Sequence, residues 1–407
     1  MSIHAKETAL SKSSTVRSPR SWRIWATAWM VTAVFMLSNS ATPLYVYWQR
    51  NIGFSNGTLT LVFAAYIVGL LLTLLFAGQL SDRFGRKTVL FPGLTAAVLA
   101  CLLFATASSV TVLLTARFLS GIAVGVIVSA GMASVVDVGI PNRRQLASLA
   151  ASVAMVLGAG LGPLLAGVLA VALSQPVVPI FAVELAVLAT AFVVAGTLPK
   201  RRIHSRQQNN WRLHLPSVPK VNQLDLAFGI AIFAPGITAT SFVLSLGPSL
   251  LAKLLHVTSP LIAGGMACIM FLTATGVQFA VKKLHVRTIF LTGASAIILS
   301  MISVAVAINA SVASLIVISA VLAGAGQGLG QLGGLTLISL HVPEHRRAEA
   351  NAVLNIGGYI PAAILPVCTG YLIDVMGLTI GATAFAVILS VVAVSASLFV
   401  RTRLQKE

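Results

Sequence analysis

The chain has 407 residues, of which 57% are hydrophobic and only 9% are charged, and its mean hydropathy is +0.96. Soluble domains carry about a quarter charged residues, so this composition excludes an ordinary soluble protein and indicates an integral membrane protein. The formal net charge of +18 would favour nucleic-acid binding in a soluble protein. No polar segment is large enough to fold into a basic surface with aromatic platforms, so nucleic acid is excluded as a partner.

Apolar segments of about 20 residues, the length that crosses a hydrocarbon core of roughly 30 Å, recur along nearly the whole chain. Each is expected to be helical because lipid offers the backbone no other hydrogen-bond partner. The predicted spans are 24–47, 58–80, 88–108, 112–138, 146–171, 177–198, 225–250, 259–281, 288–308, 312–340, 350–373 and 378–400. The predicted fold class is therefore an all-α membrane protein with twelve transmembrane helices.

One long polar stretch separates the sixth predicted span from the seventh, and it divides the chain into two halves. The predicted parts are a tail (1–23), an N-terminal six-helix bundle (24–198), a linker (199–223), a C-terminal six-helix bundle (224–400) and a second tail (401–407). The basic residues of the linker can attract anionic lipid head groups, which makes membrane lipid an expected partner.

The distribution of basic residues predicts the orientation. If the N-terminus is inside, the 27 Lys and Arg residues all fall in inner segments except Arg50 and Lys253, in outer segments, and Arg117, within a span. The positive-inside rule then places both termini in the cytoplasm of a protein of the cell (inner or plasma) membrane. No cleavable leader is expected, because the first apolar run is long enough to span.

The two halves are related by an internal repeat. Sliding the chain on itself by 203 positions superimposes identical residues of the fourth and fifth spans on those of the tenth and eleventh: Gly121 on Gly324, Gly125 on Gly328, Arg143-Arg144 on Arg346-Arg347, Pro163 on Pro366 and Gly167 on Gly370. Six spans are an even number, so the repeats are parallel, and a substrate path between them is expected.

The segment between the second and third spans carries a turn glycine, one acid and a basic cluster, Gly78-Gln79-Leu80-Ser81-Asp82-Arg83-Phe84-Gly85-Arg86-Lys87. Gly78 would let two helix ends approach closely, and Gly85 would permit the positive φ of a tight turn. Asp82 can pair with Arg86 four residues on or lie at the N-terminus of another helix. A plain positive-inside loop is the alternative interpretation. The loop after the eighth span is a decayed second copy, with Lys282 for the acid and His285 for the glycine.

This run resembles motif A of the major facilitator superfamily, G-x-L-x-D-R-x-G-R-K, at every position. The resemblance implies a conformational switch formed by Gly78, Asp82, Arg83, Gly85, Arg86, Lys87 and Asp137. In that family the motif's acid and second arginine join an acid at the inner end of the fourth span and latch the cytoplasmic side against the eleventh. Asp137 is equally well interpreted as a helix-end acid near Arg143 and Arg144.

Arg117 begins the pattern Arg117-x-x-x-Gly121-x-x-x-Gly125 near the start of the fourth span. An arginine in hydrocarbon costs at least about 3 kcal/mol, so its side chain is expected to face protein or water. The alternative is that it snorkels to the outer surface. The pattern resembles motif B of the same superfamily, whose arginine is linked to proton coupling.

The fifth span combines small residues with a proline at Gly158, Gly162, Pro163 and Gly167. Such a pattern serves close helix packing, and the proline removes one backbone donor. It resembles motif C, the antiporter signature, with Ala166 in place of one glycine, and this resemblance carries the prediction of export. Ordinary helix contact is the alternative.

Glu184 lies in the sixth span, about seven residues from its outer end, where a carboxyl could carry a proton. A locally paired acid at a helix interface is an equal alternative, and Asp225 and Asp374, near span ends, are predicted as caps or loop acids. If the family arrangement holds, mostly neutral side chains line the substrate cavity, a property that favours amphipathic or weakly cationic compounds. They are Asn39, Tyr45, Met155, Thr238, Ser241, Phe242, Gln327, Gln331, Asn355 and Tyr359. Each could instead be only an interhelical contact.

The resemblance to the drug:proton antiporter group covers essentially the entire chain. It implies a monomeric multidrug-efflux transporter of small organic compounds, coupled to protons, without enzymatic activity, cofactor or metal. The nearest alternative is a proton symporter or facilitator that imports a sugar, organic acid or other metabolite. An intramembrane enzyme would need convergent catalytic groups at depth, where only Arg117 and Glu184 are available.

Overall fold

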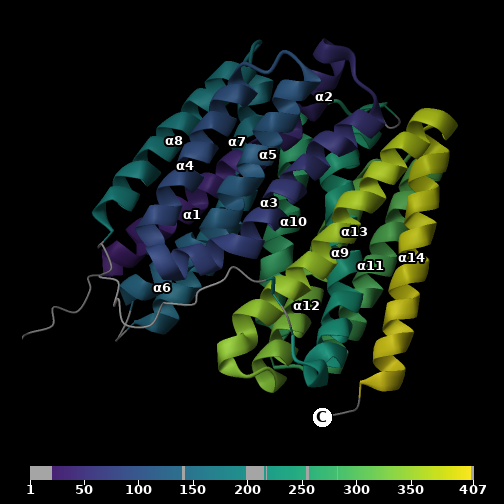
Figure 1. The fold of residues 1–407 in the computed structure, drawn as a ribbon. Helices are drawn as coiled ribbons and strands as arrows, with labels where there is room; N and C mark the ends of the chain where they lie inside the picture. The colour runs from purple at the N-terminus through teal and green to yellow at the C-terminus, as the bar shows by residue number, and fades with distance from the viewer. Residues whose placement is uncertain are drawn as a thin grey trace, which may run out of the picture.

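A computed structural model of the protein describes residues 21–139, 143–198, 215–216, 218–253, 256–281 and 283–404. Within these ranges it contains twelve helical segments long and apolar enough to cross a membrane (Figure 1). They fall on the twelve predicted spans with ends shifted by a few residues, so the predicted fold class is confirmed. Most of the two predicted tails and of the linker, as well as Lys282, lies outside the described residues.

The first six spans are built from eight α-helices, because the first and fourth spans are interrupted. Their bounds are α1 (Ser21–Ser40), α2 (Tyr45–Trp48), α3 (Asn56–Phe84), α4 (Arg86–Ala105), α5 (Val110–Val126), α6 (Met132–Gly139), α7 (Arg144–Ala172) and α8 (Val177–Thr197). A 3₁₀ turn (Thr42–Leu44) joins α1 to α2, and a π turn (Ile127–Gly131) joins α5 to α6.

The last six spans are continuous helices. Their bounds are α9 (Gln223–Lys253), α10 (Pro260–Val281), α11 (Val286–Ala310), α12 (Ser314–His341), α13 (Arg347–Met376) and α14 (Leu378–Arg403). Six prolines lie inside helices of the two halves without ending them: Pro92, Pro163, Pro235, Pro248, Pro361 and Pro366. Continuing the helix is favoured there because a membrane interior supplies no other partner for the freed backbone groups.

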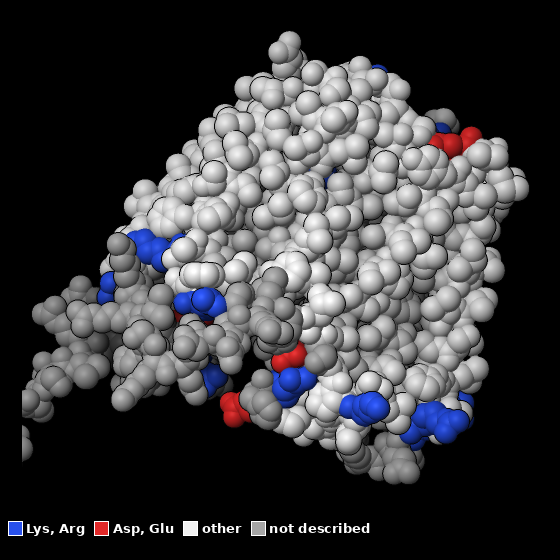
Figure 2. Space-filling model, in the orientation of Figure 1, with Lys and Arg blue, Asp and Glu red and all other residues white. Residues whose placement is uncertain are grey.

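The first helix begins at Ser21 and the last ends at Arg403, both at one end of the bundle, which we call the termini end (Figure 1). Lys and Arg gather there, and the broad middle of the face in Figure 2 is uncharged. At the opposite end, the described Lys and Arg residues are Arg50 and Lys253. This asymmetry has the pattern that the positive-inside rule predicts for a cytoplasmic termini end.

Glycines bring equivalent helices of the two halves together in the same way. A methyl group at Gly121 of α5 would overlap the carbonyl oxygen of Tyr66 in α3, and one at Gly324 of α12 would overlap that of Met270 in α10. Gly121 and Gly324 are superimposed by the 203-residue repeat, and so, within one position, are their two partners. The repeat seen in the sequence is therefore also a repeat of helix contacts.

The halves contact each other through the pairs α3 with α13 and α7 with α10, and through α2 with α9. The best-defined cross-half contacts lie at the opposite end, where Gly167 of α7 packs on Pro260 and Gly370 of α13 packs on Gly57. At the termini end, α6 packs on α1 and α7, whereas α12 packs on α9, α10 and α11. Each of these two helices therefore packs mainly within its own half.

Candidate functional site at the break in the first span

The first span loses its α-helical form between Ser40 and Tyr45. Pro43 has no backbone N–H, and the amide of Leu44 bonds instead to the carbonyl of Ala41 at 3.1 Å, closing a tighter 3₁₀ turn. The last carbonyls of α1 lose their helical partners at such an end and can accept hydrogen bonds from elsewhere. The break therefore exposes backbone and side-chain oxygens inside the N-terminal half.

Arg117 of α5 uses one of these oxygens. Its side chain is buried, with only 2% of the residue exposed, and Nη1 donates to the carbonyl of Ser38 at 2.6 Å. The guanidinium carbon also lies 5.0, 5.9 and 5.6 Å from the ring centres of Tyr45, Phe63 and Phe104. Arg117 therefore faces protein, as expected from the cost of an arginine in hydrocarbon, and does not snorkel to the surface.

The charge of Arg117 is held without a carboxylate partner. Within the described residues no Asp or Glu oxygen forms an ion pair with it, and its Nε and Nη2 make no hydrogen bond. Three aromatic faces and one carbonyl compensate only part of the desolvation of a buried cation. A group whose burial is so incompletely compensated is a candidate for function rather than for stability.

Glu184 of α8 takes a second oxygen of the break. The residue is fully buried, and its Oε1 lies 2.5 Å from the hydroxyl oxygen of Ser40. The same hydroxyl lies 2.8 Å from the carbonyl of Met36. The hydroxyl proton of Ser40 is therefore shared between the two oxygens, and a protonated Glu184 would donate to Ser40 instead. Oε2 of Glu184 has no hydrogen-bond partner in the described structure.

The motif C glycines pack α7 against the helix that carries the break. Methyl groups at Gly158 and Gly162 would overlap the carbonyl oxygens of Thr32 and Met36 in α1, so neither position admits a larger side chain. The next residue, Pro163, contributes the carbonyl oxygen that Gly264 of α10 approaches. Through these residues α7 contacts both the first span and the C-terminal half. Met36, which Gly162 approaches, is also the residue whose carbonyl lies near the hydroxyl of Ser40.

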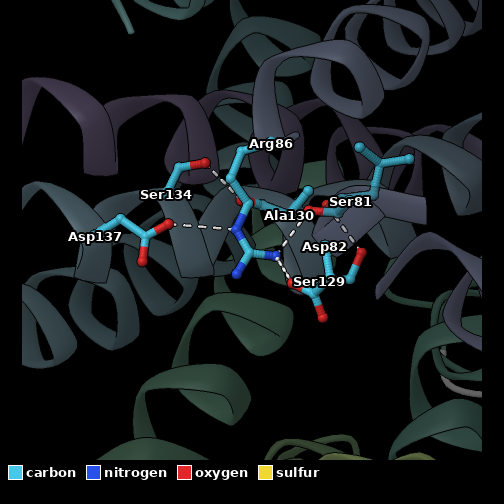
Figure 3. A network of polar contacts seen from close by, with 8 residues as sticks. Ser81, Asp82, Arg86, Ser129, Ala130, Ser134 and Asp137 are labelled. Atoms are coloured by element: carbon cyan, nitrogen blue, oxygen red, sulfur yellow. Dashed lines mark hydrogen bonds and ion pairs between the residues drawn. The ribbon is translucent and has the colours of Figure 1, made fainter. Parts of the chain in front are cut away.

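The motif A residues form a charge network at the termini end (Figure 3). Arg86 of α4 donates to Asp82 of α3 at 2.7 Å, to Asp137 of α6 at 3.3 Å and to the hydroxyl of Ser81 at 2.8 Å. Lys87 donates to the carbonyl of Gly196 at the end of α8 at 2.6 Å. The three-residue network exists as the resemblance implies, but its partners in the described chain belong to the N-terminal half.

The two motif A glycines behave differently. Gly85 ends α3 with a φ of +91°, the positive value expected of a tight turn. Gly78 was expected to bring two helix ends together, but a methyl group there would meet nothing within 4 Å. That expectation is wrong for this conformation, because no neighbouring helix of the described chain approaches the position. Arg83 lies 5.3 Å from the ring of Phe84.

Some predicted cavity residues are packed inside one half instead. Tyr45 is fully buried against Arg117, and Phe242 is fully buried and stacked on Phe385 at 4.2 Å. Thr238 is fully buried and donates to the carbonyl of Ala234 at 2.7 Å. These three side chains do not line open space in this conformation, because neighbouring helices of their own half fill it; Ser241 is likewise buried, at 4% exposure.

The remaining predicted cavity residues are half-buried: Asn39, Met155, Gln327, Gln331, Asn355 and Tyr359. Asn39 donates to the carbonyl of Phe35 at 2.9 Å, and the ring of Tyr359 meets that of Phe233 edge-on at 6.4 Å. These six residues remain predicted substrate contacts.

Sequence reasoning missed two parts of the site. It passed over Ser40, although the run Ser40-Ala41-Thr42-Pro43 signals a helix break, and it assigned Asp374 only a capping or loop role. Asp374 does cap a helix, but that helix is α3 of the other half. No group of three or more His, Cys, Asp or Glu residues that could hold a metal occurs in the described part of the chain.

Comparison with known proteins identifies the family of the chain. Residues 25–308 and 281–407 match the Major Facilitator Superfamily, so the chain belongs to this family. The protein is a multi-pass secondary transporter that binds a small substrate, and it is not an enzyme.

Two curated relatives are multidrug resistance proteins, matched over short regions. The chain is 31% identical over 129 residues to Multidrug resistance protein 2 of Bacillus subtilis (strain 168), covering 31% of this chain and 32% of the relative. It is 37% identical over 71 residues to Multidrug resistance protein MdtL of Escherichia coli O139:H28 (strain E24377A / ETEC), covering 17% and 18%. The matches therefore span about a third or less of the relatives' length.

Solved structures share the fold over nearly the whole chain. An inward-facing, unoccupied bacterial homologue of the human lysosomal transporter Spinster superimposes with a TM-score of 0.72, covering 95% of this chain and 98% of that one at 14% identity. A POT family transporter in complex with a thioalcohol-conjugated peptide gives 0.73, covering 95% and 96% at 12% identity. At such identities the likeness shows the fold alone.

Proposed function

We propose that the protein exports small organic compounds in exchange for protons, by alternating access of a site between its two halves. The observation that carries the proposal is the hydroxyl of Ser40, which lies within hydrogen-bond distance of both Met36 and Glu184. A neutral Glu184 donates to Ser40 and leaves the hydroxyl proton to Met36, whereas an ionised Glu184 competes with Met36 for it, so the contacts favour a Glu184 that binds and releases a proton during the cycle.

The contact with Ser40 couples the proton on Glu184 to the end of α1. Ser40 is the last residue of α1, and the segment that follows it reaches α9 of the other half through α2. When Glu184 loses its proton, its carboxylate competes with the carbonyl of Met36 for the hydroxyl proton of Ser40, which weakens the bond at the end of α1. Arg117 stabilises the same break through the carbonyl of Ser38 and is the second coupling residue.

The direction of transport rests on two supports. The fifth span carries the motif C residues Gly158, Gly162, Pro163 and Gly167, and the partial sequence matches are to multidrug resistance proteins. The mostly neutral, half-buried side chains predicted for the cavity fit an amphipathic or weakly cationic compound. We place the termini end in the cytoplasm and take the protein to be a monomer that needs no cofactor.

Proteoliposomes test the proposal directly. Purified wild-type protein and the variant Glu184→Gln, which mimics a permanently protonated carboxyl, are reconstituted with a fluorescent lipophilic cation as the probe. An inward proton gradient should drive probe export by the wild type, whereas Glu184→Gln should lose gradient-driven export and keep exchange of probe in the absence of a gradient.

Three results would contradict the proposal. If wild-type transport is indifferent to the gradient in sealed vesicles, proton coupling is wrong. If protons and substrate move in the same direction, the protein is an importer, such as a symporter of a sugar or organic acid. Normal gradient-driven export by Glu184→Gln would show that another residue carries the proton.

A further inference from the structure

The motif A core recurs near the other end of the chain. The pattern Gly-x-Leu-x-Asp-x-x-Gly occurs at residues 78–85 and again at residues 370–377. The first copy ends α3, in the N-terminal half, and the second ends α13, in the C-terminal half. The two copies are not related by the 203-residue repeat, so they form a separate internal correspondence.

The backbone of the two copies is also the same. Gly85 has φ and ψ of 91° and 150°, and Gly377 has 89° and 159°, values that residues with a side chain rarely adopt. The amide of Gly85 bonds to the carbonyl of Ser81 at 3.1 Å, and that of Gly377 to the carbonyl of Ile373 at 2.9 Å. Each copy is therefore one structural unit: a helix end, an acid and a glycine turn.

These units lie at opposite ends of one cross-half helix pair. Helices α3 and α13 pack against each other, and they run in opposite directions (Figure 1). The copy in α3 lies at the termini end, where α13 begins at Arg347, and the copy in α13 lies at the opposite end, where α3 begins at Asn56. The acid of each copy therefore lies at the same end of the bundle as the N-terminus of the helix that its own helix packs against.

At the opposite end, the acid is engaged with that N-terminus. Oδ1 of Asp374 accepts from the amide of Asn56 at 3.0 Å and from its side chain at 3.1 Å, and Oδ2 accepts from the amide of Gly57 at 2.8 Å. These amides have no partner within their own helix, and the helix dipole favours a carboxylate there. Gly57 makes room, since a methyl group on it would lie 2.6 Å from the ring of Tyr371.

Further polar contacts tie two more spans to this point. Lys253 at the end of α9 donates to Oδ1 of Asn56 at 3.3 Å, and Gln49 of the first span donates to the same oxygen at 3.3 Å. Ser249 of α9 donates to Gln49 at 3.2 Å. The first, second, seventh and eleventh spans therefore meet around Asn56 and Asp374.

At the termini end, the other acid is disengaged. The side chain of Asp82 is 69% exposed, and its ion-pair partner is Arg86 of its own half. Gly78 has open space where the equivalent Gly370 packs closely on Thr60 and Gly57. In this one conformation, one copy of the motif joins the halves and the other does not.

We propose that Asp374 is the positioning residue of a latch that closes the opposite end of the transporter by capping α3 across the two halves. The copy with Asp82 is its counterpart at the termini end, and the two copies engage alternately as the halves rock. The inference rests on the alternating-access part of the proposed function. In each state one of the two acids caps the partner helix. The number of carboxylates with hydrogen-bond donors is therefore similar in both states.

Distance measurements between spin labels test the latch. Labels are placed on introduced cysteines at the exposed positions Ser108 and Ser311, which straddle the halves at the opposite end, in a protein whose native cysteines are replaced by alanine. A second pair, at Phe84 and Leu340, reports the termini end. Both pairs are measured in lipid nanodiscs, with and without the lipophilic cation probe and at two pH values.

The expected result is a change of opposite sign at the two ends. Asp374→Asn should raise the population with a long Ser108–Ser311 distance about tenfold and shorten the Phe84–Leu340 distance, because the amide has no charge and offers one acceptor oxygen where the carboxylate uses two. Asp374→Glu, which retains the charge, should restore most of the wild-type distribution. Asp82→Asn should leave the opposite end closed or close it further.

Three outcomes would overturn the latch. If the wild type alternates between two distance distributions and Asp374→Asn shows the same distributions as the wild type, the cap has no role in closure. If Asp374→Asn and Asp82→Asn shift both pairs in the same direction, the effect is a general loosening of the fold. If the wild type shows one distribution under every condition, alternating access itself fails, and the latch fails with it.

Discussion

The two halves of the protein pack alike but differ in what they bury. Equivalent glycines bring equivalent helices together, yet among the described residues the buried charged side chains, Arg117 and Glu184, both lie in the N-terminal half. The buried polar residues described in the other half are uncharged. At the 203-residue offset Arg117 corresponds to Ala320, which is fully buried. The fold therefore does not require the charge, and this asymmetry fits the proton coupling that we propose for the N-terminal half.

The largest expected effect comes from removing the charge of Arg117, which has no counterpart in the C-terminal half. Arg117→Met should lower gradient-driven export by roughly a hundredfold. Burying an arginine costs about 3 kcal/mol, and a chain that keeps the arginine at that cost is expected to use it in the transport cycle. The apparent melting temperature should stay the same or rise, since an apolar side chain fills the site without desolvation. Initial export rates and thermal unfolding of the purified variant check both. Ala320→Ser is the matched control at the equivalent position, and normal transport by Arg117→Met would contradict the assignment.

The shared packing is tested by a matched pair of glycine variants. Gly121→Ala and Gly324→Ala should each destabilise the protein by about 1–3 kcal/mol, because a methyl group would overlap a carbonyl oxygen of the facing helix. Thermal unfolding of the two variants should give similar losses. Gly276→Ala is the control, since that position has nothing within 4 Å and alanine favours a helix. Strongly unequal losses for the pair would show that the halves do not pack alike.

A smaller effect is expected from the hydroxyl at the break. Ser40→Ala should reduce gradient-driven export about tenfold, because a hydrogen bond to a charged group contributes about 1.5–3 kcal/mol. Ser40→Thr keeps a hydroxyl and should recover most of the activity. The control is Ser245→Ala, because Ser245 is fully buried in the other half and donates only to carbonyls of its own helix. Equal losses for Ser40→Ala and Ser245→Ala would remove Ser40 from the coupling mechanism.

The smallest effect belongs to the exposed charge network. Asp137→Asn should lower the free energy of unfolding by less than about 1 kcal/mol, because 42% of the Asp137 side chain is exposed and water screens its pairing with Arg86. Arg287→Gln, which removes a surface contact of the other half with the carbonyl of Arg401, should cost a similar amount. Chemical denaturation of the three proteins measures this, and a loss of several kcal/mol for Asp137→Asn would show that the network is structural.

Much of the fold could be predicted because membrane spans are long, apolar and helical by necessity. The positive φ of Gly85 was also predictable, since only glycine occupies that conformation freely. The open space beside Gly78 was not predictable, because whether a glycine faces a neighbouring helix depends on which conformation the two halves adopt. The sequence likewise predicted that Arg117 faces protein or water, but it could not identify the acceptor, a backbone carbonyl that becomes available only where α1 ends.

Side-chain depth was the least predictable property of the site. Tyr45 and Phe242 have types that suit a substrate cavity, and the structure buries both among rings of their own half. Amphipathic pattern is weak in a helix whose surroundings are apolar on all sides, so it does not tell which face meets the cavity. The capping role expected of Asp374 was correct in kind, but which helix it caps follows only from the tertiary contacts.

The interrupted first span has a pharmacological consequence. Two charged groups from different helices, Arg117 and Glu184, depend on oxygens within three residues of one another, at Ser38 and Ser40. A small molecule that straightened this short stretch would uncouple both groups at once without competing for the substrate. Inhibition of that kind would be insensitive to substrate concentration, and escape mutations would appear near Pro43 rather than in the predicted substrate cavity.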